Sequence, residues 1–343
     1  MTGSVPVHPR GRLRLALFVL AALAVAAPLI AGFLGALHPA LDSFAHFRAH
    51  LAVAAGLLAV SGLLAVGRRG RGVALALIVP AVAAGWTVAP FLVSGAGVEG
   101  LGGRIACAAN GAVCPAGADR AEAGGAADGR TLTLLQMNLL RPADPSAAIA
   151  AIVRHAPDLV TLQEMQEGFP EALAAAGGDY PHVAVCPPHD QRIAILSRRP
   201  FVPDEGACVG EHGFLSRTVA VSGRHVAVVS QHLRWPWPFS QWYHLDGLAD
   251  DLSALAAPVV VGGDFNAVPW SAAVATFARL SGTMPVAGIG ATWLHPTFPD
   301  GWRPLVGLPI DHVLVSPAVG IVSVTRLPAT ASDHLPVLVR LRP

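Results

Sequence analysis

Polar residues that can bind a metal ion or move a proton recur at one kind of place in this chain, the end of a short apolar run. Asn138 follows the run 134–137, and Glu164 follows the run 159–163. Any one such residue is more often a turn or cap residue, but six such places in one sequence argue against that reading. Because side chains at strand ends converge when strands pack in sheets, the pattern predicts a single site. Its other members are His232 after 228–231, Asp264 and Asn266 after 259–263, Asp311 before 312–315, and Asp333 and His334 before 335–337.

The residue types at these places suit metal-assisted hydrolysis of a phosphate ester. Hard carboxylate and amide oxygens, without a cluster of cysteines and histidines, favour Mg²⁺ or Mn²⁺ over zinc. A histidine beside an aspartate can stabilise charge on a phosphoryl oxygen or transfer a proton. The chain has neither the G-x-S-x-G elbow of a serine hydrolase nor a Walker A loop, so those two chemistries lack support.

The part of the chain that holds these residues has the pattern of an α/β domain. From Thr131 onward, short apolar runs alternate with helical stretches, which indicates strands and helices in alternation. Residues 131–343 are enough for one domain with a substantial core. We expect strands at 131–137, 158–162, 193–197, 218–221, 225–231, 259–261, 310–315 and 336–341, and helices at 145–155 and 240–255.

Taken in order, the motifs resemble the endonuclease/exonuclease/phosphatase superfamily, which includes type I deoxyribonucleases, abasic-site endonucleases, sphingomyelinases and inositol-polyphosphate phosphatases. The resemblance covers about 131–343 and implies a four-layer α/β sandwich, with two packed mixed sheets flanked by helices. The G-D-F-N and S-D-H motifs are its most specific features. The matching segments are 137–138, 162–164, 195–198, 231–233, 263–266, 310–312 and 332–334.

The resemblance also implies roles for the site residues. Glu164 would ligate the metal ion with Asn138 beside it, and Asp333 would assist. Asp264 would orient or deprotonate the attacking water, and Asn266 would hold a phosphate oxygen.

Three further assignments follow from the same resemblance. His334 would contact the scissile phosphate, with Asp311 fixing its ring. His232 matches the histidine of the deoxyribonuclease and sphingomyelinase branches. The abasic-site endonucleases have a tyrosine at that place, so His232 argues against abasic-site repair.

Three apolar runs precede this domain, at about 15–37, 44–66 and 73–93. Each is long enough to cross a bilayer, which takes roughly 20 residues as a helix. The first run could instead be a cleaved signal peptide, and the other two could be buried core helices. The length of the first run and the near absence of charge in the others favour a retained anchor, residues 1–93, with three transmembrane helices. The mean hydropathy of +0.53 is too high for a wholly soluble protein.

The basic residues predict the orientation of this anchor. The positive-inside rule places the N-terminus and the loop between the second and third spans in the cytoplasm. Residues 131–343 would then lie outside the cytoplasm. The arginines that carry this argument are Arg10, Arg12 and Arg14 before the first span, and Arg68, Arg69 and Arg71 before the third.

Residues 94–130 are rich in glycine and alanine and predict a flexible linker. An even number of cysteines outside the cytoplasm permits disulfides. Cys107 and Cys114 could close a small loop. For Cys186 and Cys208 a disulfide and two plain buried thiols are equally consistent with the sequence.

Two features bear on the substrate. Three spans followed by this domain resemble the bacterial glycopeptide-resistance (VanJ-type) group, as does the pair 292–293, which implies a phosphorylated envelope or lipid-linked substrate. Aromatic residues also follow His232, at Trp235, Trp237, Phe239 and 242–243. They could pack the turn between strand and helix, or form a rim that meets lipid head groups or stacks on bases.

The leading functional prediction is a membrane-anchored phosphoesterase that hydrolyses a phosphate ester or anhydride of a lipid-linked, envelope or small-molecule substrate. The alternatives are an extracytoplasmic nuclease and an inactive binding or scaffold domain. The formal net charge is only +1, which counts against a dedicated nucleic-acid binder. The complete set of site residues counts against an inactive domain. No sequence feature indicates a protein partner.

Overall fold

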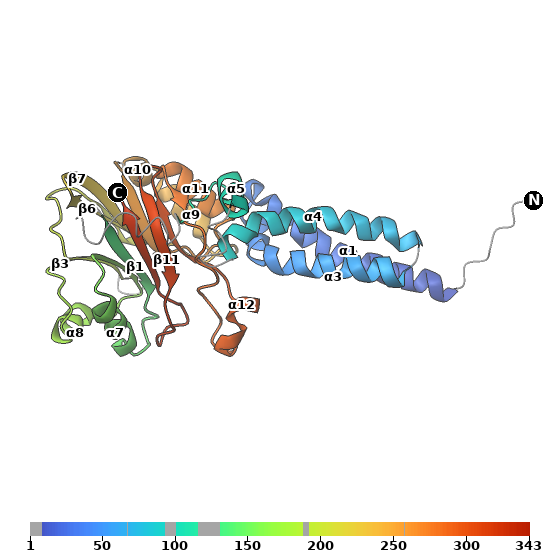
Figure 1. Ribbon diagram of the computed structural model, residues 1–343, viewed down its shortest axis with the longest axis horizontal. Coiled ribbons are helices and arrows are strands. Elements are labelled where there is room, and N and C mark those ends of the chain that lie inside the picture. Colours follow the sequence, from blue (N-terminus) through green and yellow to red (C-terminus); the bar gives the residue numbers. More distant parts are fainter. Residues whose placement is uncertain (1–8, 67, 93–100, 116–130, 188–191, 257) are drawn as a thin grey trace, which may run out of the picture. The chain divides into compact units, whose positions relative to one another are not determined.

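The computed structural model describes residues 9–66, 68–92, 101–115, 131–187, 192–256 and 258–343. The chain forms two compact units, Met1–Val88 and Ala89–Pro343, and each is described by itself (Figure 1).

Long apolar helices make up the first unit. Three of them are long and apolar enough to cross a membrane, over Gly11–Phe33, Pro39–Leu64 and Gly70–Leu92. The prediction of three apolar helices of membrane-spanning length is therefore confirmed, with ends a few residues away from those expected; Val93 lies outside the described residues. The helices are α1 (Pro9–Phe33), η1 (Gly35–Leu37), α2 (Pro39–Ser43), η2 (Phe44–Phe47), α3 (Arg48–Ala65) and α4 (Arg68–Leu92).

In the most apolar stretch of each candidate span, only 22% of the residues are buried inside the structure. Small side chains such as Ala22, Ala55 and Ala84 pack the helices together, while Leu57 and Leu64 point outward. Helices with this much outward apolar surface are suited to a lipid environment rather than to water.

Two six-stranded sheets form the framework of the second unit. The first has the strand order β11-β12-β1-β2-β4-β3, and the second β5-β6-β7-β8-β10-β9. The strands of the first sheet are β1 (Leu132–Asn138), β2 (Leu159–Gln163), β3 (His182–Cys186), β4 (Ile193–Ser197), β11 (Gly320–Arg326) and β12 (Val337–Arg342). Those of the second are β5 (Cys208–Val209), β6 (Phe214–Val221), β7 (Arg224–His232), β8 (Val259–Asp264), β9 (Met284–Pro285) and β10 (Asp311–Val315).

Each sheet has a central parallel pair, β1 with β2 and β7 with β8, and its other pairs are antiparallel. Parallel strands end at the same edge of a sheet. Since β12 runs antiparallel to β1 and β10 antiparallel to β8, the segments that lead into β12 and β10 reach that same edge. This is where the polar residues of the sequence pattern lie.

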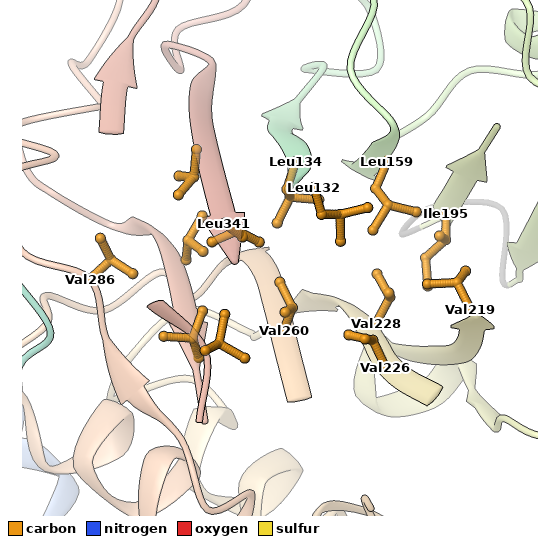
Figure 2. Close-up of a cluster of buried hydrophobic side chains, with 14 of the residues drawn as sticks. Leu132, Leu134, Leu159, Ile195, Val219, Val226, Val228, Val260, Val286 and Leu341 are labelled. Carbon is orange, nitrogen blue, oxygen red and sulfur yellow. The ribbon is translucent and has the colours of Figure 1, made fainter. Parts of the chain in front are cut away.

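The main core lies between the two sheets (Figure 2). Leu134 and Ile195 from the first sheet face Val228 and Val260 from the second, and all four are fully buried. β-branched and leucine side chains fill a pleated surface well, which is why these runs form strands.

Helices cover the outer face of each sheet. A second cluster packs α7 and α8 on the first sheet, through residues such as Ile152 and Phe169. A third packs α9, α10 and α11 on the second sheet, through residues such as Leu245 and Phe277. The four-layer sandwich is confirmed. The helices of this unit are α5 (Leu101–Ala109), α7 (Ser146–His155), α8 (Phe169–Ala175), η5 (Gly210–His212), α9 (Gln241–Gly247), α10 (Ala249–Ser253), α11 (Ala272–Leu280), η6 (Asp300–Trp302) and α12 (Arg303–Val306).

The structure differs from the expected flexible linker at 101–115. These residues form α5 and a loop closed by the Cys107–Cys114 disulfide. Val113 then joins the second sheet, donating to the Pro285 carbonyl oxygen at 2.9 Å and accepting from the Ala287 amide at 2.9 Å. A short disulfide loop and two backbone bonds hold a segment that its composition alone marks as flexible; 94–100 and 116–130 lie outside the described residues.

The second disulfide joins Cys186 to Cys208. Cys186 ends β3, an outer strand of the first sheet, and Cys208 begins β5, an outer strand of the second. The bond therefore ties the two sheets together at one side of the sandwich, which settles the alternative that the sequence left open.

Candidate active site

Strand register brings the predicted site residues to one edge of the sandwich. β7 places His232 beside Asp264 of β8, and β10 places Asp311 on the other side of Asp264. In the first sheet, Asn138 at the end of β1 pairs with Gln163 at the end of β2, so Glu164 is the next residue out. His334 comes just before β12.

Tight turns follow the two central strands. Glu164 and Asn266 have φ of 53° and 47°, in the left-handed region that non-glycine residues rarely adopt and that tends to occur at functional sites. The two glycines before Asp264 have no room for a side chain. A Cβ on Gly262 would lie 2.2 Å from the Thr161 hydroxyl, and one on Gly263 would lie 2.4 Å from the Gln231 carbonyl oxygen. Only glycines permit β8 to deliver Asp264 at this depth.

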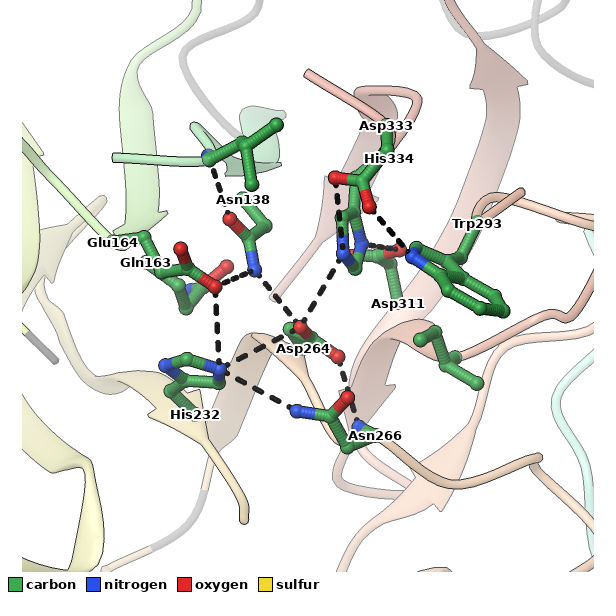
Figure 3. A network of polar contacts seen from close by, with 12 residues as sticks. Asn138, Gln163, Glu164, His232, Asp264, Asn266, Trp293, Asp311, Asp333 and His334 are labelled. Carbon is green, nitrogen blue, oxygen red and sulfur yellow. Dashed lines mark hydrogen bonds and ion pairs between the residues drawn. The ribbon is translucent and has the colours of Figure 1, made fainter. Parts of the chain in front are cut away.

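The Asp264 carboxylate is the centre of the site (Figure 3). Its Oδ1 accepts from the Asn266 backbone amide at 2.8 Å, and its Oδ2 accepts from Asn138 Nδ2 at 2.9 Å. The same Oδ2 lies 3.6 Å from His232 Nε2 and 3.7 Å from His334 Nε2. Burial raises the pKa of Asp264 against the opposing effect of the two imidazoles. A raised pKa makes this carboxylate a better proton acceptor.

His334 is held by a second buried carboxylate. Its Nδ1 donates to Asp311 Oδ2 at 2.8 Å, while Gln136 Nε2 donates to Asp311 Oδ1 at 3.1 Å. Burial by itself would lower the pKa of His334, but Asp311, Asp264 and Asp333 outweigh it and raise that pKa to about 10. The ring is therefore a charged donor whose Nε2 faces the site.

Glu164 and Asn138 form the other side of the site. Asn138 Nδ2 donates to Glu164 Oε1 at 3.1 Å, and Asn138 Oδ1 accepts from the Leu140 amide at 2.9 Å. Glu164 Oε1 lies 3.9 Å from His232 Nε2. The Glu164 side chain is 26% exposed and that of Asp264 only 1%, so Glu164 is the more open of the two carboxylates.

Asp333 lies across Asn138 from Glu164 in the view of Figure 3. Its Oδ2 accepts from Trp293 Nε1 at 2.8 Å. Its Oδ1 lies 3.8 Å from His334 Nε2 and is buried without a hydrogen-bond partner among the described residues. Such an oxygen is costly to bury unless a cation or a donor reaches it.

A family model described as Endonuclease/Exonuclease/phosphatase family matches residues 135–334, more than half of the chain. The chain belongs to this family.

Solved structures with the fold of this family resemble the second unit. An AP endonuclease from Archaeoglobus fulgidus is 17% identical, with a TM-score of 0.50 over 61% of this chain and 98% of that one. An endonuclease/exonuclease/phosphatase from Beutenbergia cavernae is 22% identical, with a TM-score of 0.49 over 62% and 72%. One from Bacteroides vulgatus is 18% identical, with a TM-score of 0.49 over 62% and 98%.

A search of curated protein sequences finds no match. The likeness to solved structures is one of fold, and the resemblance to the VanJ-type group stays a prediction.

Endonuclease/exonuclease/phosphatase family enzymes generally depend on divalent metals, and the residues present fit such an ion. Four carboxylates, those of Glu164, Asp264, Asp311 and Asp333, converge on two imidazoles, which leaves an excess of negative charge. Hard oxygen donors of this kind suit Mg²⁺ or Mn²⁺.

Ligand atoms of Asp264, Asp311 and His334 lie within 4.8 Å of one another. The raised pKa of His334 favours its protonated ring, so a metal ion would have to displace a proton to bind Nε2. The more exposed carboxylates of Glu164 and Asp333 are better placed. Asn138 turns its amide nitrogen, and not its oxygen, toward Glu164, so its geometry favours a role in positioning that carboxylate.

Several residues that support the site were given no role in it from the sequence. Gln136 bonds both Asp311 and Gln163 from inside an apolar strand. The Thr292 hydroxyl accepts from the Asp311 amide at 3.1 Å. Arg303 Nη1 donates to the Asp333 carbonyl oxygen at 2.9 Å. A polar residue within a buried apolar run, as Gln136 is, is the one signal the sequence offered.

The aromatic residues after His232 are mostly exposed. Trp235, Trp237, Phe239 and Tyr243 are between 51% and 72% exposed, whereas Trp242 packs against the core cluster of the second sheet. Trp235 makes an edge contact with Trp293, with ring centroids 6.0 Å apart. Because Trp293 bonds Asp333, Trp235 stands beside the site.

Proposed function

We propose that this protein is a membrane-anchored, divalent-metal-dependent phosphoesterase that hydrolyses a phosphate ester or anhydride of a lipid-linked or envelope substrate. The observation that carries the proposal is the position of the Asp264 carboxylate, buried between the Nε2 atoms of His232 and His334. A carboxylate of raised pKa between two imidazoles is arranged to take a proton from water beside donors for a phosphoryl group.

Asp264 orients the attacking water and accepts its proton as the water oxygen bonds to phosphorus. His334 Nε2 donates to a non-bridging phosphoryl oxygen, where negative charge develops. The bond from phosphorus to the leaving oxygen breaks, and that oxygen takes a proton, for which His232 Nε2 is placed. Asn266 is assigned to a second phosphoryl oxygen, and Asp311 is a positioning residue that keeps the His334 ring charged and aligned.

Glu164 and Asp333 would hold the divalent ion, with Asn138 positioning Glu164. The ion would polarise a phosphoryl oxygen and offset its developing charge. The buried Asp333 Oδ1, which lacks a hydrogen-bond partner in the described part of the chain, supports this assignment.

We place the second unit outside the cytoplasm. The arginines before the first and third spans support this orientation, and so do the two disulfides, because disulfides persist in oxidising compartments. A lipid-linked substrate is supported by the three candidate spans and by the exposed tryptophans Trp235 and Trp237, since tryptophan favours the bilayer interface.

An extracytoplasmic nuclease is the second candidate, since exposed aromatics can also stack on bases. The test is hydrolysis by the full chain in detergent with Mg²⁺, against sphingomyelin, a polyprenyl pyrophosphate and DNA, with His334→Ala as the control. Preference for a lipid substrate is the expected result. Preference for DNA would establish the nuclease, and a folded, metal-loaded protein inactive on every phosphate ester would leave only a scaffold.

A further inference from the structure

A cleft of about 430 Å³ lies against the candidate site, and no role assigned so far uses it. It shares Asp333 with the site, and two more of its lining residues bond site residues directly. The Ser332 hydroxyl accepts from the His334 amide at 3.1 Å, and the Leu140 amide donates to Asn138 Oδ1. A molecule in the cleft is therefore next to the group that reacts.

The lining of this cleft is mixed, with apolar side chains such as Leu140, Leu294 and Phe298 on one part and polar ones such as Thr330 and Asp333 on another. Leu294 is buried, whereas Phe298 is 43% exposed at the protein surface. A cleft of this size with an apolar part can hold the apolar portion of a small ligand, and burial of that portion contributes to binding.

The charged groups of the cleft argue against a nucleic acid. Asp300 and Asp333 are acidic, and the only cationic residue among those lining it is Arg303. Arg303 is already bonded to the carbonyl oxygens of Thr292 and Asp333 and to the Asp300 carboxylate. A polyanion needs cations that are available to its phosphates, and this cleft presents none.

The segment that contributes Phe298 to the cleft continues along the surface as an exposed apolar edge. The Phe298 ring stacks on Trp302 with centroids 6.0 Å apart, and Trp302 and Leu305 are 50% and 71% exposed. Apolar edges of this kind are uncommon on soluble surfaces and mark contact with another apolar phase.

We propose that the cleft binds the apolar chain of a phosphorylated lipid, a phosphate or pyrophosphate ester of a long-chain alcohol, while its phosphate lies at Asp264 and His334. The inference deepens the proposed function and rests on it. The exposed edge of Phe298, Trp302 and Leu305 is where the chain enters.

The test uses the full chain in detergent and two variants of the cleft. Phe298→Ser removes an apolar wall, and Ala329→Trp fills the space. Val183→Ser is the matched control, because Val183 is 41% exposed on β3 and is not part of the cleft. None of the three residues belongs to the catalytic set.

The substrates are ethyl, butyl, hexyl and octyl para-nitrophenyl phosphate, below their critical micelle concentrations. The parent protein and Val183→Ser should show kcat/KM at least about tenfold higher for the octyl than for the ethyl ester, the effect of burying about two methylene groups. Phe298→Ser and Ala329→Trp should lose most of this preference while the ethyl ester is hydrolysed as before. Equal rates for all four esters would overturn the cleft assignment and leave the proposed function intact.

Binding of octylphosphonate and ethylphosphonate, measured by calorimetry, gives a readout that does not depend on hydrolysis. Tighter binding of the octyl compound, lost in the two cleft variants and kept in Val183→Ser, supports the inference even if no ester is cleaved and the proposed function fails. Equal binding of the two phosphonates overturns it, and so does displacement of octylphosphonate by a single-stranded oligonucleotide.

Discussion

His334 Nδ1 lies 2.8 Å from Asp311 Oδ2, and this contact helps to raise the pKa of a buried imidazole. Gln136 holds the other oxygen of the same carboxylate. His334 therefore reaches the site in a fixed orientation, which is the condition for stabilising charge without reorganisation.

Asp264 and His334 should act mainly in the transition state. Asp264→Asn keeps the shape but removes the basic oxygen, and His334→Ala removes the donor. Each should lower kcat by about a hundredfold or more, while KM changes much less because uniform substrate binding is retained. Melting temperature measured on the same variants separates catalysis from folding; a folded variant with near-normal kcat would remove the assignment.

Asp311→Asn should also lower kcat, although Asp311 touches no substrate in our mechanism. Without the negative charge the His334 ring loses its strongest electrostatic partner, and we expect a loss of roughly tenfold to a hundredfold, the scale for residues that orient a catalytic group. KM should stay close to that of the parent. The neighbouring His312→Gln serves as the control, because His312 bonds the Ala267 carbonyl oxygen and not His334; equal losses in both variants would indicate a general packing effect.

Hydrolysis should require a divalent metal. Removal of metal by EDTA should abolish turnover, and Mg²⁺ or Mn²⁺ should restore it. The reason is that the carboxylates of Glu164 and Asp333 are hard oxygen ligands, which these ions prefer. Glu164→Gln should raise the metal concentration needed for half-maximal activity. Undiminished hydrolysis in chelator would contradict the metal assignment.

The orientation of the chain can be tested with reporters fused at two places. A reporter that works only after export should be active when fused after Pro343 and inactive when fused at Arg71, since the arginines of that loop hold it in the cytoplasm. A cytoplasmic reporter should show the reverse pattern. Cytoplasmic activity at Pro343 would reverse the topology.

His312 should make the protein less stable in mild acid. Burial lowers the pKa of His312 to about 4, despite its bond to Ala267 and the nearby Asp311. Below the unfolded value of 6.5 the unfolded chain takes up a proton that the folded chain refuses, so stability falls as pH drops from 6.5 toward 4. The loss is on the order of 3 kcal/mol at the acid end.

His312→Gln removes this titration while keeping a donor for the Ala267 carbonyl oxygen. The melting temperature of the full chain, compared with that of the variant across this pH window, measures the difference in slope and not the absolute stability. Parallel curves for the two proteins would show that His312 does not titrate as its burial demands.

The elements around the site could be read from the sequence because they depend on local patterns. Each polar site residue follows or precedes an apolar run, and a buried run with a polar end predicts a strand with a functional edge. The prediction placed the strand 193–197 where β4 lies. It missed the strands β3, β5, β9 and β11 and the helices α5, α8, α11 and α12, and it treated α9 and α10 as one helix.

What sequence alone determined, then, was the set of strand-end residues, their order, the family and the three apolar spans. The tertiary structure decided how those residues are used. Gln136 bonds Asp311 across 175 positions of sequence, Trp293 bonds Asp333 across 40, and Cys186 pairs with Cys208 because β3 and β5 lie at the same side of two different sheets. No local sequence pattern encodes such contacts. They join residues that are far apart in the sequence and that meet only once the two sheets have packed together.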